Sequence, residues 1–384
     1  MSKRKLVRIT TIPLSLDKLL QGQLRFMREH FDIVAVSSER EYLEKIGQRE
    51  GVETYPVNMT RQITPHKDLW ALLKLWLFFL KTKPHIVHTH TPKAGIVGML
   101  AAQLAGVPYR LHTVAGLPLL EAIGKKRKLL DYVEKLTYHC ATHVLPNSKG
   151  LKKIILDLGF TSPKKIKVLA NGSSNGIDTS YFSTAHFSFA QKVDLKESLQ
   201  ITDADFVFVF VGRLVSDKGI NEAVSAFKKV SITYPQSKLL LVGPLESELD
   251  PLNPETLEAI SHCPAIIAVG YQPDVRPYLA ISDCLVFPSY REGFPNVVMQ
   301  AGAMDLPAIV SDINGCNEII IPGENGIIVP AKSEVTLMEA MELMLSDEPL
   351  RNRLKSNARR MIVERYEQRV VWEALLKEYQ GMGL

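Results

Sequence analysis

The run FVFVFVGRLVSDKG, residues 206–219, carries the clearest structural signal in the sequence. Residues 206–211 are apolar without interruption, as in strands of a parallel sheet that helices cover on both faces. At Gly212 the chain must turn, and a glycine lets backbone approach a ligand closely. Arg213 and Lys218 follow at the carboxyl end of the expected strand. Two cations there are suited to neutralise a diphosphate, although an ordinary solvated loop would also fit so short a pattern.

Similar apolar runs alternate with amphipathic stretches along most of the 384 residues. This alternation predicts βαβ units and parallel sheets. Helical stretches include 16–30, 93–105, 125–140 and 149–158, and the pattern is helical from Glu334 to Tyr379. The expected strands are 6–9, 31–37, 52–57, 86–90, 109–114, 143–145, 166–169, 206–211, 238–242, 265–269, 284–287, 308–310 and 327–329.

The alternation pauses at residues 171–200, which open with NGSSNGID and then lack periodicity, as expected of an interdomain linker. The predicted fold class is therefore α/β, with two doubly wound parallel sheets. We expect one Rossmann-like domain at 1–178, a linker at 179–203, a second Rossmann-like domain at 204–364, and a helix at 365–384 that packs on the first domain. Such sheets bind ligands at the carboxyl ends of their strands, which predicts a site in the cleft between the domains.

The cysteines and the apolar stretches exclude several classes of protein. Four cysteines lie far apart without a CxxC pair, which argues against a disulfide framework and a zinc site and suits a reducing cytosol. No apolar run of signal-peptide length precedes Pro13. The most apolar stretch, LWALLKLWLFFL at 69–80, is much shorter than the roughly 20 residues that span a bilayer. We expect a buried helix that leads into the strand at Ile86.

Charge is divided unevenly along the chain. Residues 1–178 hold 28 Lys and Arg against 14 Asp and Glu, whereas residues 179–384 hold 18 against 27. A basic first half suggests an anionic partner, which could be a membrane surface, a phosphorylated acceptor or nucleic acid. Nucleic acid is not expected, because no recognised motif is present and no aromatic platform lies among the cations.

A second motif, FPSYREGFPNVVMQAGAMDLPAIVSDINGCNE, occupies residues 287–318. In its loop, the Glu292 carboxylate could accept hydrogen bonds from sugar hydroxyls. Asn296 is suited to cap a helix at 297–304, and the free N–H groups at a helix start favour an anion. A capped helix behind a polar loop would explain Asn296 but not the whole run.

The run EGFPNVVMQAGAMDLP resembles the signature of the retaining glycosyltransferases of family 4, in which one Glu is followed after seven residues by a second. VGRLVSDKG, NGSSNGID, IVHTHTPKAG and TVAGLP resemble other motifs of that family in the family's order. The resemblance therefore covers most of the chain. It implies the GT-B fold, in which two Rossmann-like domains face each other across a cleft.

The resemblance also implies roles for individual residues. Arg213 and Lys218 would hold the donor diphosphate and, together with Glu292 on the donor sugar, would form the catalytic set. The other implied contacts are the donor-binding Gly22, Gly212, Gly293, Phe294, Pro295, Asn296 and Gln300, the acceptor-side His90 and Lys93, and Glu318 in support.

Two positions depart from the family pattern. Gln300 replaces the second Glu, which in the family commonly binds the ribose. The glutamine keeps one donor and one acceptor group but loses a charged hydrogen bond, typically worth about 1.5–3 kcal/mol. Ala115 stands where many relatives have His. His112 would point to the opposite face of a strand, so we expect no transfer of that role to it.

The resemblance implies a metal-independent hexosyltransferase without a cofactor other than its nucleotide-sugar co-substrate, expected to be UDP-linked. It would transfer a hexose or N-acetylhexosamine to a polyprenyl-diphosphate-linked or other glycan acceptor in the synthesis of a cell-surface polysaccharide. A nucleotide-sugar epimerase and a catalytically degenerate sugar-binding relative are the alternatives.

A basic cluster also suggests where the protein works. Lys125, Lys126, Arg127 and Lys128 begin an amphipathic stretch that resembles the basic face by which relatives dock on anionic bilayers. A solvated helix end is the alternative interpretation. We therefore expect a cytoplasmic protein that is peripheral on the cytoplasmic face of the inner membrane.

Overall fold

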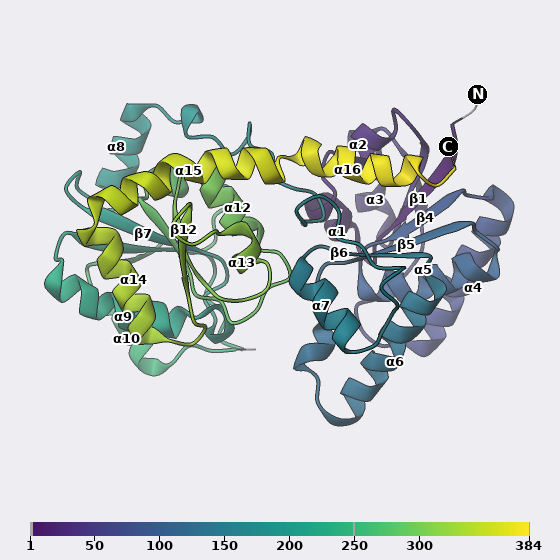
Figure 1. Cartoon of the computed structure of the whole chain (residues 1–384), viewed down its shortest axis with the longest axis horizontal. Coiled ribbons are helices and arrows are strands. Elements are labelled where there is room, and N and C mark those ends of the chain that lie inside the picture. The colour runs from purple at the N-terminus through teal and green to yellow at the C-terminus, as the bar shows by residue number, and fades with distance from the viewer. Residues whose placement is uncertain (1–2, 249, 384) are drawn as a thin grey trace. The chain divides into compact units, whose positions relative to one another are not determined.

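The computed structural model describes residues 3–248 and 250–383, which form two compact units (Figure 1). Unit 1 contains the residues up to Gly176 and those from Gln368 onward. Unit 2 contains Ile177–Glu367. The C-terminal segment therefore belongs with the first unit and begins three residues later than position 365, where the sequence placed it.

Unit 1 is built on a parallel six-stranded sheet with the order β3-β2-β1-β4-β5-β6. The order reverses between β1 and β4, so the loops that follow these two strands share one edge of the sheet. Doubly wound sheets bind their ligands at this position. The strands are β1 (Lys5–Ile9), β2 (Asp32–Ser37), β3 (Glu53–Pro56), β4 (Ile86–Thr89), β5 (Tyr109–Val114) and β6 (His143–Pro146).

Helices cover both faces of this sheet (Figure 1). Alternate strand residues point to opposite faces, so Leu6 and Ile33 join one core while Val7 and Val34 join the other. The first core is covered by α1 (Pro13–Leu19), α2 (Gln23–Met27), α3 (Arg40–Glu50) and α16 (Gln368–Gln380). The second is covered by α4 (Pro65–Thr82), α5 (Pro92–Leu104), α6 (Gly124–Cys140) and α7 (Lys149–Asp157), with a short 3-10 helix at Pro118–Glu121.

Two predicted elements of unit 1 are wrong. The single helix expected at 16–30 is broken into α1 and α2, because Gly22 adopts a left-handed backbone conformation with φ of +77°. The strand expected at 166–169 is reduced to one isolated bridge between Val144 and Ile166. The periodicity of apolar residues predicts neither feature, since a single glycine and a single bridge leave the apolar pattern unchanged.

The helix α4 is not buried as the sequence suggested. Ala71, Leu75 and Phe79 face the core, but Trp70 and Leu77 on the outer side are 74% and 59% exposed. The sheet can cover only one face of a helix that lies on it, so the second apolar face stays at the surface. Among the described residues, no helix is long and apolar enough to cross a bilayer.

Unit 2 has the same construction, with the parallel order β12-β11-β10-β7-β8-β9. The apolar run that dominated the sequence is β7, which pairs with β8 and β10 inside the sheet. The strands are β7 (Phe206–Val211), β8 (Ser237–Val242), β9 (Ile266–Ala268), β10 (Cys284–Phe287), β11 (Ala308–Ser311) and β12 (Gly326–Val329). The helices are α8 (Phe189–Ser198), α9 (Ile220–Thr233), α10 (Pro254–His262), α11 (Arg276–Ala280), α12 (Asn296–Ala303), α13 (Cys316–Ile319), α14 (Glu334–Ser346) and α15 (Glu348–Tyr366), with 3-10 turns at Thr184–His186 and Ser216–Lys218.

The segment expected as a linker, 179–203, folds inside unit 2. It contains α8, which starts with a capping box between Ser188 and Gln191. Long-range contacts hold the segment in place. The Arg276 guanidinium stacks 3.6 Å from the centre of the Tyr181 ring, and Arg359 donates to the backbone oxygen of Phe182 at 2.8 Å. Such contacts leave no local pattern in the sequence, so a structured segment looked like a linker.

Candidate functional site

The strand order of unit 2 brings two distant segments together at the carboxyl edge of its sheet. The first strand, β7, lies beside the fourth, β10, and the order reverses between them. The loop after β7 holds residues 212–219 and the loop after β10 holds residues 288–295. The backbone N–H of Tyr290 donates to the Asp217 oxygen at 2.9 Å, and Arg291 pairs with the Asp217 carboxylate at 2.9 Å. The two predicted motifs therefore form one site.

The centre of this site is an ion pair between Lys218 and Glu292. The two side chains are 19% and 18% exposed, so both are accessible and neither is freely solvated. Ser289 donates its hydroxyl proton to Glu292 Oε1 at 3.2 Å. Gly219 makes this approach possible, because its φ is +71° and a Cβ there would lie 2.2 Å from the Pro288 oxygen.

Arg213 lies in the same loop but has a different partner. Its guanidinium pairs with Glu246 at 2.7 Å and the side chain is 48% exposed. The preceding turn is tight, since a Cβ on Gly243 would lie 1.7 Å from the Gly212 oxygen. Both predicted diphosphate ligands are thus held at the carboxyl edge of the sheet, each opposite its own carboxylate.

Residues of the loop after β11 bind the backbone of the neighbouring loop, in which Glu292 lies. Asn314 donates its side-chain amide to the backbone oxygens of Glu292 at 3.1 Å and Gly293 at 2.6 Å. A Cβ on Gly315 would lie 2.8 Å from the Gly293 oxygen and 2.9 Å from the Phe294 Cα. The roles of Asn314 and Gly315 were not predicted from the sequence, although an Asn-Gly pair between a strand and a helix is a signal for a turn.

The helix behind this loop differs in one detail from the prediction. The helix α12 begins at Asn296, its N-cap is Pro295, and no side chain caps it. Asn296 is therefore the first helical residue and not the cap. The centre of the Phe294 ring lies 5.5 Å from that of Tyr366 in α15. Gln300 is half-buried in α12.

The next short helix, α13, is bound to α15 through Glu318, and its cysteine, Cys316, is not suited to act as a nucleophile. The backbone oxygen of Glu318 accepts a hydrogen bond from the Tyr366 hydroxyl at 2.9 Å. Burial raises the pKa of the Cys316 thiol, and the negative charge of Glu292 raises it further. This cysteine therefore stays protonated at neutral pH. Within the described residues, no group of three or more His, Cys, Asp and Glu side chains could hold a metal ion.

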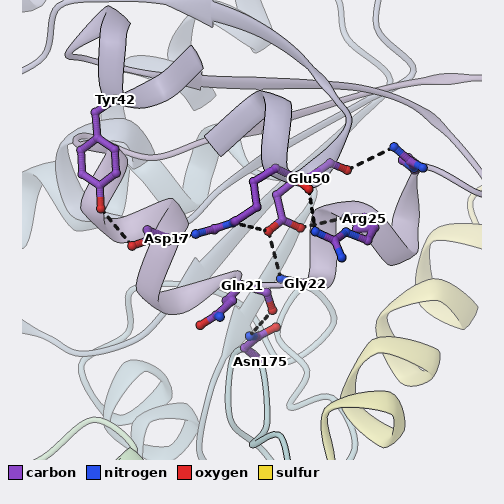
Figure 2. Close-up of polar contacts among 9 residues, drawn as sticks. Asp17, Gln21, Gly22, Arg25, Tyr42, Glu50 and Asn175 are labelled. Carbon is purple, nitrogen blue, oxygen red and sulfur yellow. Dashed lines mark hydrogen bonds and ion pairs between the residues drawn. The ribbon is translucent and has the colours of Figure 1, made fainter. Parts of the chain in front are cut away.

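In unit 1, the loop after β1 is organised by a buried carboxylate. Glu50 accepts hydrogen bonds from the backbone N–H groups of Gly22 at 3.4 Å and Arg25 at 3.3 Å (Figure 2). Asn175 donates its side-chain amide to the Gln21 oxygen at 3.0 Å. A Cβ on Gly22 would lie 2.8 Å from the Trp372 ring, so only glycine fits at this turn. The predicted donor contact of Gly22 stays a prediction.

The residues after β4 include His90 in the loop and Lys93 in the first turn of α5. His90 is buried, and its Nε2 lies 3.0 Å from the donating Nε of Arg8, a fully buried arginine. Burial, followed by the charges of His88 and Arg8, holds the pKa of His90 well below its usual range, so the imidazole is neutral. Lys93 is largely buried and pairs with Asp68 at the start of α4. Both side chains are engaged within unit 1, and their acceptor-side role stays a prediction.

His112 and the basic cluster at residues 125–128 also lie in unit 1. His112 is buried and bonded to the Thr89 hydroxyl at 2.8 Å, which agrees with a structural role. The cations Lys125, Lys126 and Lys128 are exposed in the first turn of α6, and Arg127 pairs with Asp131 at 2.7 Å. The first turn of α6 therefore presents a basic surface.

Both halves of the chain match known families. Residues 22–172 match the family described as glycosyl transferase 4-like domain, and residues 191–361 match the family described as glycosyl transferases group 1. A relative from Staphylococcus aureus, the capsular polysaccharide biosynthesis glycosyltransferase CapM, is 32% identical over 99% of this chain and 100% of its own length.

A second relative, from Escherichia coli, is a UDP-Gal:alpha-D-GlcNAc-diphosphoundecaprenol alpha-1,3-galactosyltransferase. It is 31% identical over 87% of this chain and 85% of its own length. Among solved structures, HepE from Anabaena in complex with UDP and glucose has a TM-score of 0.81 over 98% of this chain and 100% of its own, at 16% identity. This likeness confirms the predicted fold, and the sequence relatives confirm the activity class. The chain belongs to the GT-B glycosyltransferases of the group 1 and 4-like families.

Proposed function

We propose that this protein transfers a hexose or N-acetylhexosamine, with retention of configuration, from a UDP-sugar to a polyprenyl-diphosphate-linked glycan. The observation that carries the proposal is the Lys218–Glu292 pair at the carboxyl edge of the unit 2 sheet. The name of the Escherichia coli relative supports the donor and the acceptor class, because it specifies UDP-galactose and a diphosphoundecaprenol-linked sugar.

The chemistry follows from the charges of this site. A donor diphosphate would compete with Glu292 for the Lys218 ammonium and with Glu246 for the Arg213 guanidinium. When the bond between the anomeric carbon and the phosphate oxygen breaks, its electron pair leaves with the nucleoside diphosphate. Once the donor is bound, both cations already contact the diphosphate and stabilise that growing charge without further reorganisation. The acceptor oxygen forms the new bond to the anomeric carbon, and its proton passes to the departing phosphate.

Glu292 has the complementary role. Released from Lys218, its carboxylate can accept hydrogen bonds from hydroxyls of the donor sugar. Ser289 and Asn314 hold the residue from opposite ends, one at the carboxylate and one at its backbone oxygen. The site would therefore position the sugar with a preorganised group, and no metal ion or other cofactor is required. Activity should be unchanged after treatment with a chelator.

The decisive experiment replaces Lys218 by Ala and measures release of nucleoside diphosphate from UDP-, GDP- and ADP-sugars in the presence of a lipid-diphosphate acceptor. We expect turnover to fall about 100-fold or more, as for other electrostatic stabilisers. Lys229→Ala is the matched control, because Lys229 also pairs with a glutamate, Glu334, on the same unit. Near-normal turnover of Lys218→Ala would refute the donor-site assignment.

The same assay separates this proposal from its alternatives. A transferase releases nucleoside diphosphate in step with glycosylated acceptor. An epimerase would convert the UDP-sugar without acceptor and without release. A catalytically degenerate relative would bind the nucleotide in calorimetry and release nothing.

We further propose that the protein works at the cytoplasmic face of an anionic membrane. The support is the excess of cations in residues 1–178 and the exposed Lys125, Lys126 and Lys128 at the start of α6. Anionic lipids attract such clusters by about 1 kcal/mol for each cation near the surface. Failure to sediment with anionic vesicles at low salt would contradict this placement.

A further inference from the structure

The outer face of α4 is apolar and exposed. Leu69, Trp70, Leu77 and Leu80 are 58%, 74%, 59% and 44% exposed, and Leu73 between them is half-buried. Residues three, four, seven, eight and eleven positions apart share one face of a helix, so these side chains form one stripe. The opposite face is the one that packs on the sheet. The helix is therefore apolar on two faces, of which unit 1 covers one.

Cations run along one edge of the stripe. Lys67, Lys74 and Lys81 follow each other at intervals of seven residues, or about two turns, and all three are exposed. Asp68 is the one acidic residue of α4, and it lies at the inner side, paired with Lys93. An apolar stripe with an aromatic residue and a flanking row of lysines is the pattern of a helix that lies in a membrane interface.

The neighbouring helices strengthen this pattern. The helix α5 packs between α4 and α6, so all three belong to the layer that covers one face of the sheet (Figure 1). Two apolar side chains of this region are also exposed, Ile123 directly before the basic first turn of α6 and Tyr132 about two turns further along the helix. The outer surface of this layer therefore combines apolar side chains with cations at both α4 and α6.

An antiparallel pair of α4 helices from two copies of this chain is a poor partner for the stripe. A symmetric dimer of that kind brings the same patch of two molecules together and places the two lysine rows on the same side, close to each other. Like charges in an interface cost several kcal/mol when juxtaposed, whereas anionic lipid headgroups satisfy the same lysines. The charges thus favour a bilayer as the partner.

We propose that α4 inserts its outer stripe, Leu69, Trp70, Leu73, Leu77 and Leu80, into the interface of an anionic bilayer. The insertion deepens the proposed function, because it names the surface from which a lipid-linked acceptor is reached. The Asp68–Lys93 pair joins the first turn of this helix to the first turn of α5, which follows β4. Docking of α4 would therefore set the distance between Lys93, the predicted acceptor-side lysine, and the bilayer surface.

Trp70 provides a direct test with the whole protein. Vesicles of phosphatidylglycerol and phosphatidylcholine should shift its emission to shorter wavelength, and lipids brominated on the upper acyl chain should quench it. Trp70→Phe should lose both changes, which assigns them to this residue and not to Trp76 or Trp372. Emission that is unchanged by vesicles to which the protein is bound would overturn the proposal.

A pair of variants tests the contribution of the stripe to binding. We expect Trp70→Ser/Leu77→Ser to lower co-sedimentation with the same vesicles at least tenfold, and to do so at both 0.1 M and 0.5 M salt. Ile232→Ser/Val335→Ser is the matched control, because both residues are exposed apolar side chains of unit 2. Equal binding by the stripe variant and the control would overturn the proposal. Dissociation of a wild-type dimer by Trp70→Ser/Leu77→Ser, seen in analytical ultracentrifugation, would also overturn it by assigning the stripe to a second copy.

Transfer assays separate this proposal from the proposed reaction. The stripe variant should equal the wild type on a short-chain, water-soluble diphosphate acceptor and be slower on a polyprenyl acceptor in vesicles. If the wild type quenches on brominated lipid but transfers to neither acceptor, the proposed reaction fails and the membrane helix stands. If it transfers to both acceptors and the stripe variant is equally fast on both, the membrane helix fails and the reaction stands.

Discussion

Gly315 offers a sharp test of how the loop that carries Glu292 is held in position. Its φ of +79° with a ψ of −46° is unfavourable for any residue with a Cβ, and replacement by Ala would cost about 1–3 kcal/mol on this ground alone. The new Cβ would also lie 2.8 Å from the Gly293 oxygen, 2.9 Å from the Phe294 Cα and 2.9 Å from the Pro295 Cδ. Ordinary contact begins at 3.4 Å, so the loop that carries Glu292 must move by roughly 0.6 Å.

Both consequences can be given a magnitude. Forced shifts of packed backbone cost about 1–3 kcal/mol, so Gly315→Ala should destabilise the protein by about 2–6 kcal/mol in total. A displacement of this size at a positioned group can reduce turnover by roughly 10- to 100-fold. Gly323→Ala is the control, because Gly323 has nearly the same φ, +78°, and no atom within 4 Å of its Cβ position.

Both variants carry the cost of a positive φ, so the difference between them reports mainly the steric clash at Gly315. Thermal unfolding should show Gly315→Ala melting about 2–12 °C below Gly323→Ala, since the clash costs about 1–3 kcal/mol and 1 kcal/mol corresponds to about 2–4 °C in a unit of this size. Release of nucleoside diphosphate should fall for Gly315→Ala alone. Equal melting temperatures together with full turnover would refute the inference that this glycine holds the Glu292 loop.

Three further predictions concern single residues. Gly95→Ala should destabilise unit 1 by about 1–3 kcal/mol in urea unfolding, because the new Cβ would lie 2.6 Å from the buried His112 ring, while Gly116→Ala, with open space at its Cβ, should be neutral. Burial lowers the pKa of His112 to about 4, so the unfolded chain binds a proton between pH 6.5 and 4 that the folded chain does not. Stability should therefore fall through this window on acidification, with about 3 kcal/mol from this residue, and a urea midpoint that is constant between pH 7 and pH 4.5 would contradict the assignment. Gln300→Glu should leave nucleotide affinity in calorimetry within a few-fold if Gln300 binds the ribose, whereas a large change in either direction would show a different mode of donor binding.

Most strands and helices of both units could be predicted from local patterns in the sequence. The strand β7 was predicted at its observed bounds because an uninterrupted apolar run before a glycine has few other interpretations. The motifs of the proposed donor site were also visible in the sequence. Their pairing across 74 residues, from Lys218 to Glu292, follows only from the strand order.

Features that depend on distant contacts were invisible. Nothing near Glu50 in the sequence indicates that its carboxylate holds the backbone of Gly22. The helix α4 illustrates the same limit differently. An apolar stretch with weak periodicity is equally compatible with burial on all sides and with one apolar face left at the surface. Only the position of α4 beside α5 at the sheet decides between them.

The two sheets of this chain share a topology and use it differently. In unit 2 the switch point holds Lys218 opposite a carboxylate, both partly exposed, so a diphosphate can replace Glu292 without leaving a bare charge. In unit 1 the corresponding edge holds Arg8, which is fully buried, and no carboxylate in the described part of the chain pairs with it. A ligand can exchange with the first cation, whereas the second is fixed to His90 and Gln23. Removal of the Lys218 charge should therefore act on turnover, and removal of the Arg8 side chain should act on stability. Lys218 and Arg8 occupy corresponding edges of two similar sheets, and they differ in whether a ligand can reach the charge. This accessibility, and not the position in the fold, distinguishes a residue that can bind a ligand from one that stabilises the structure.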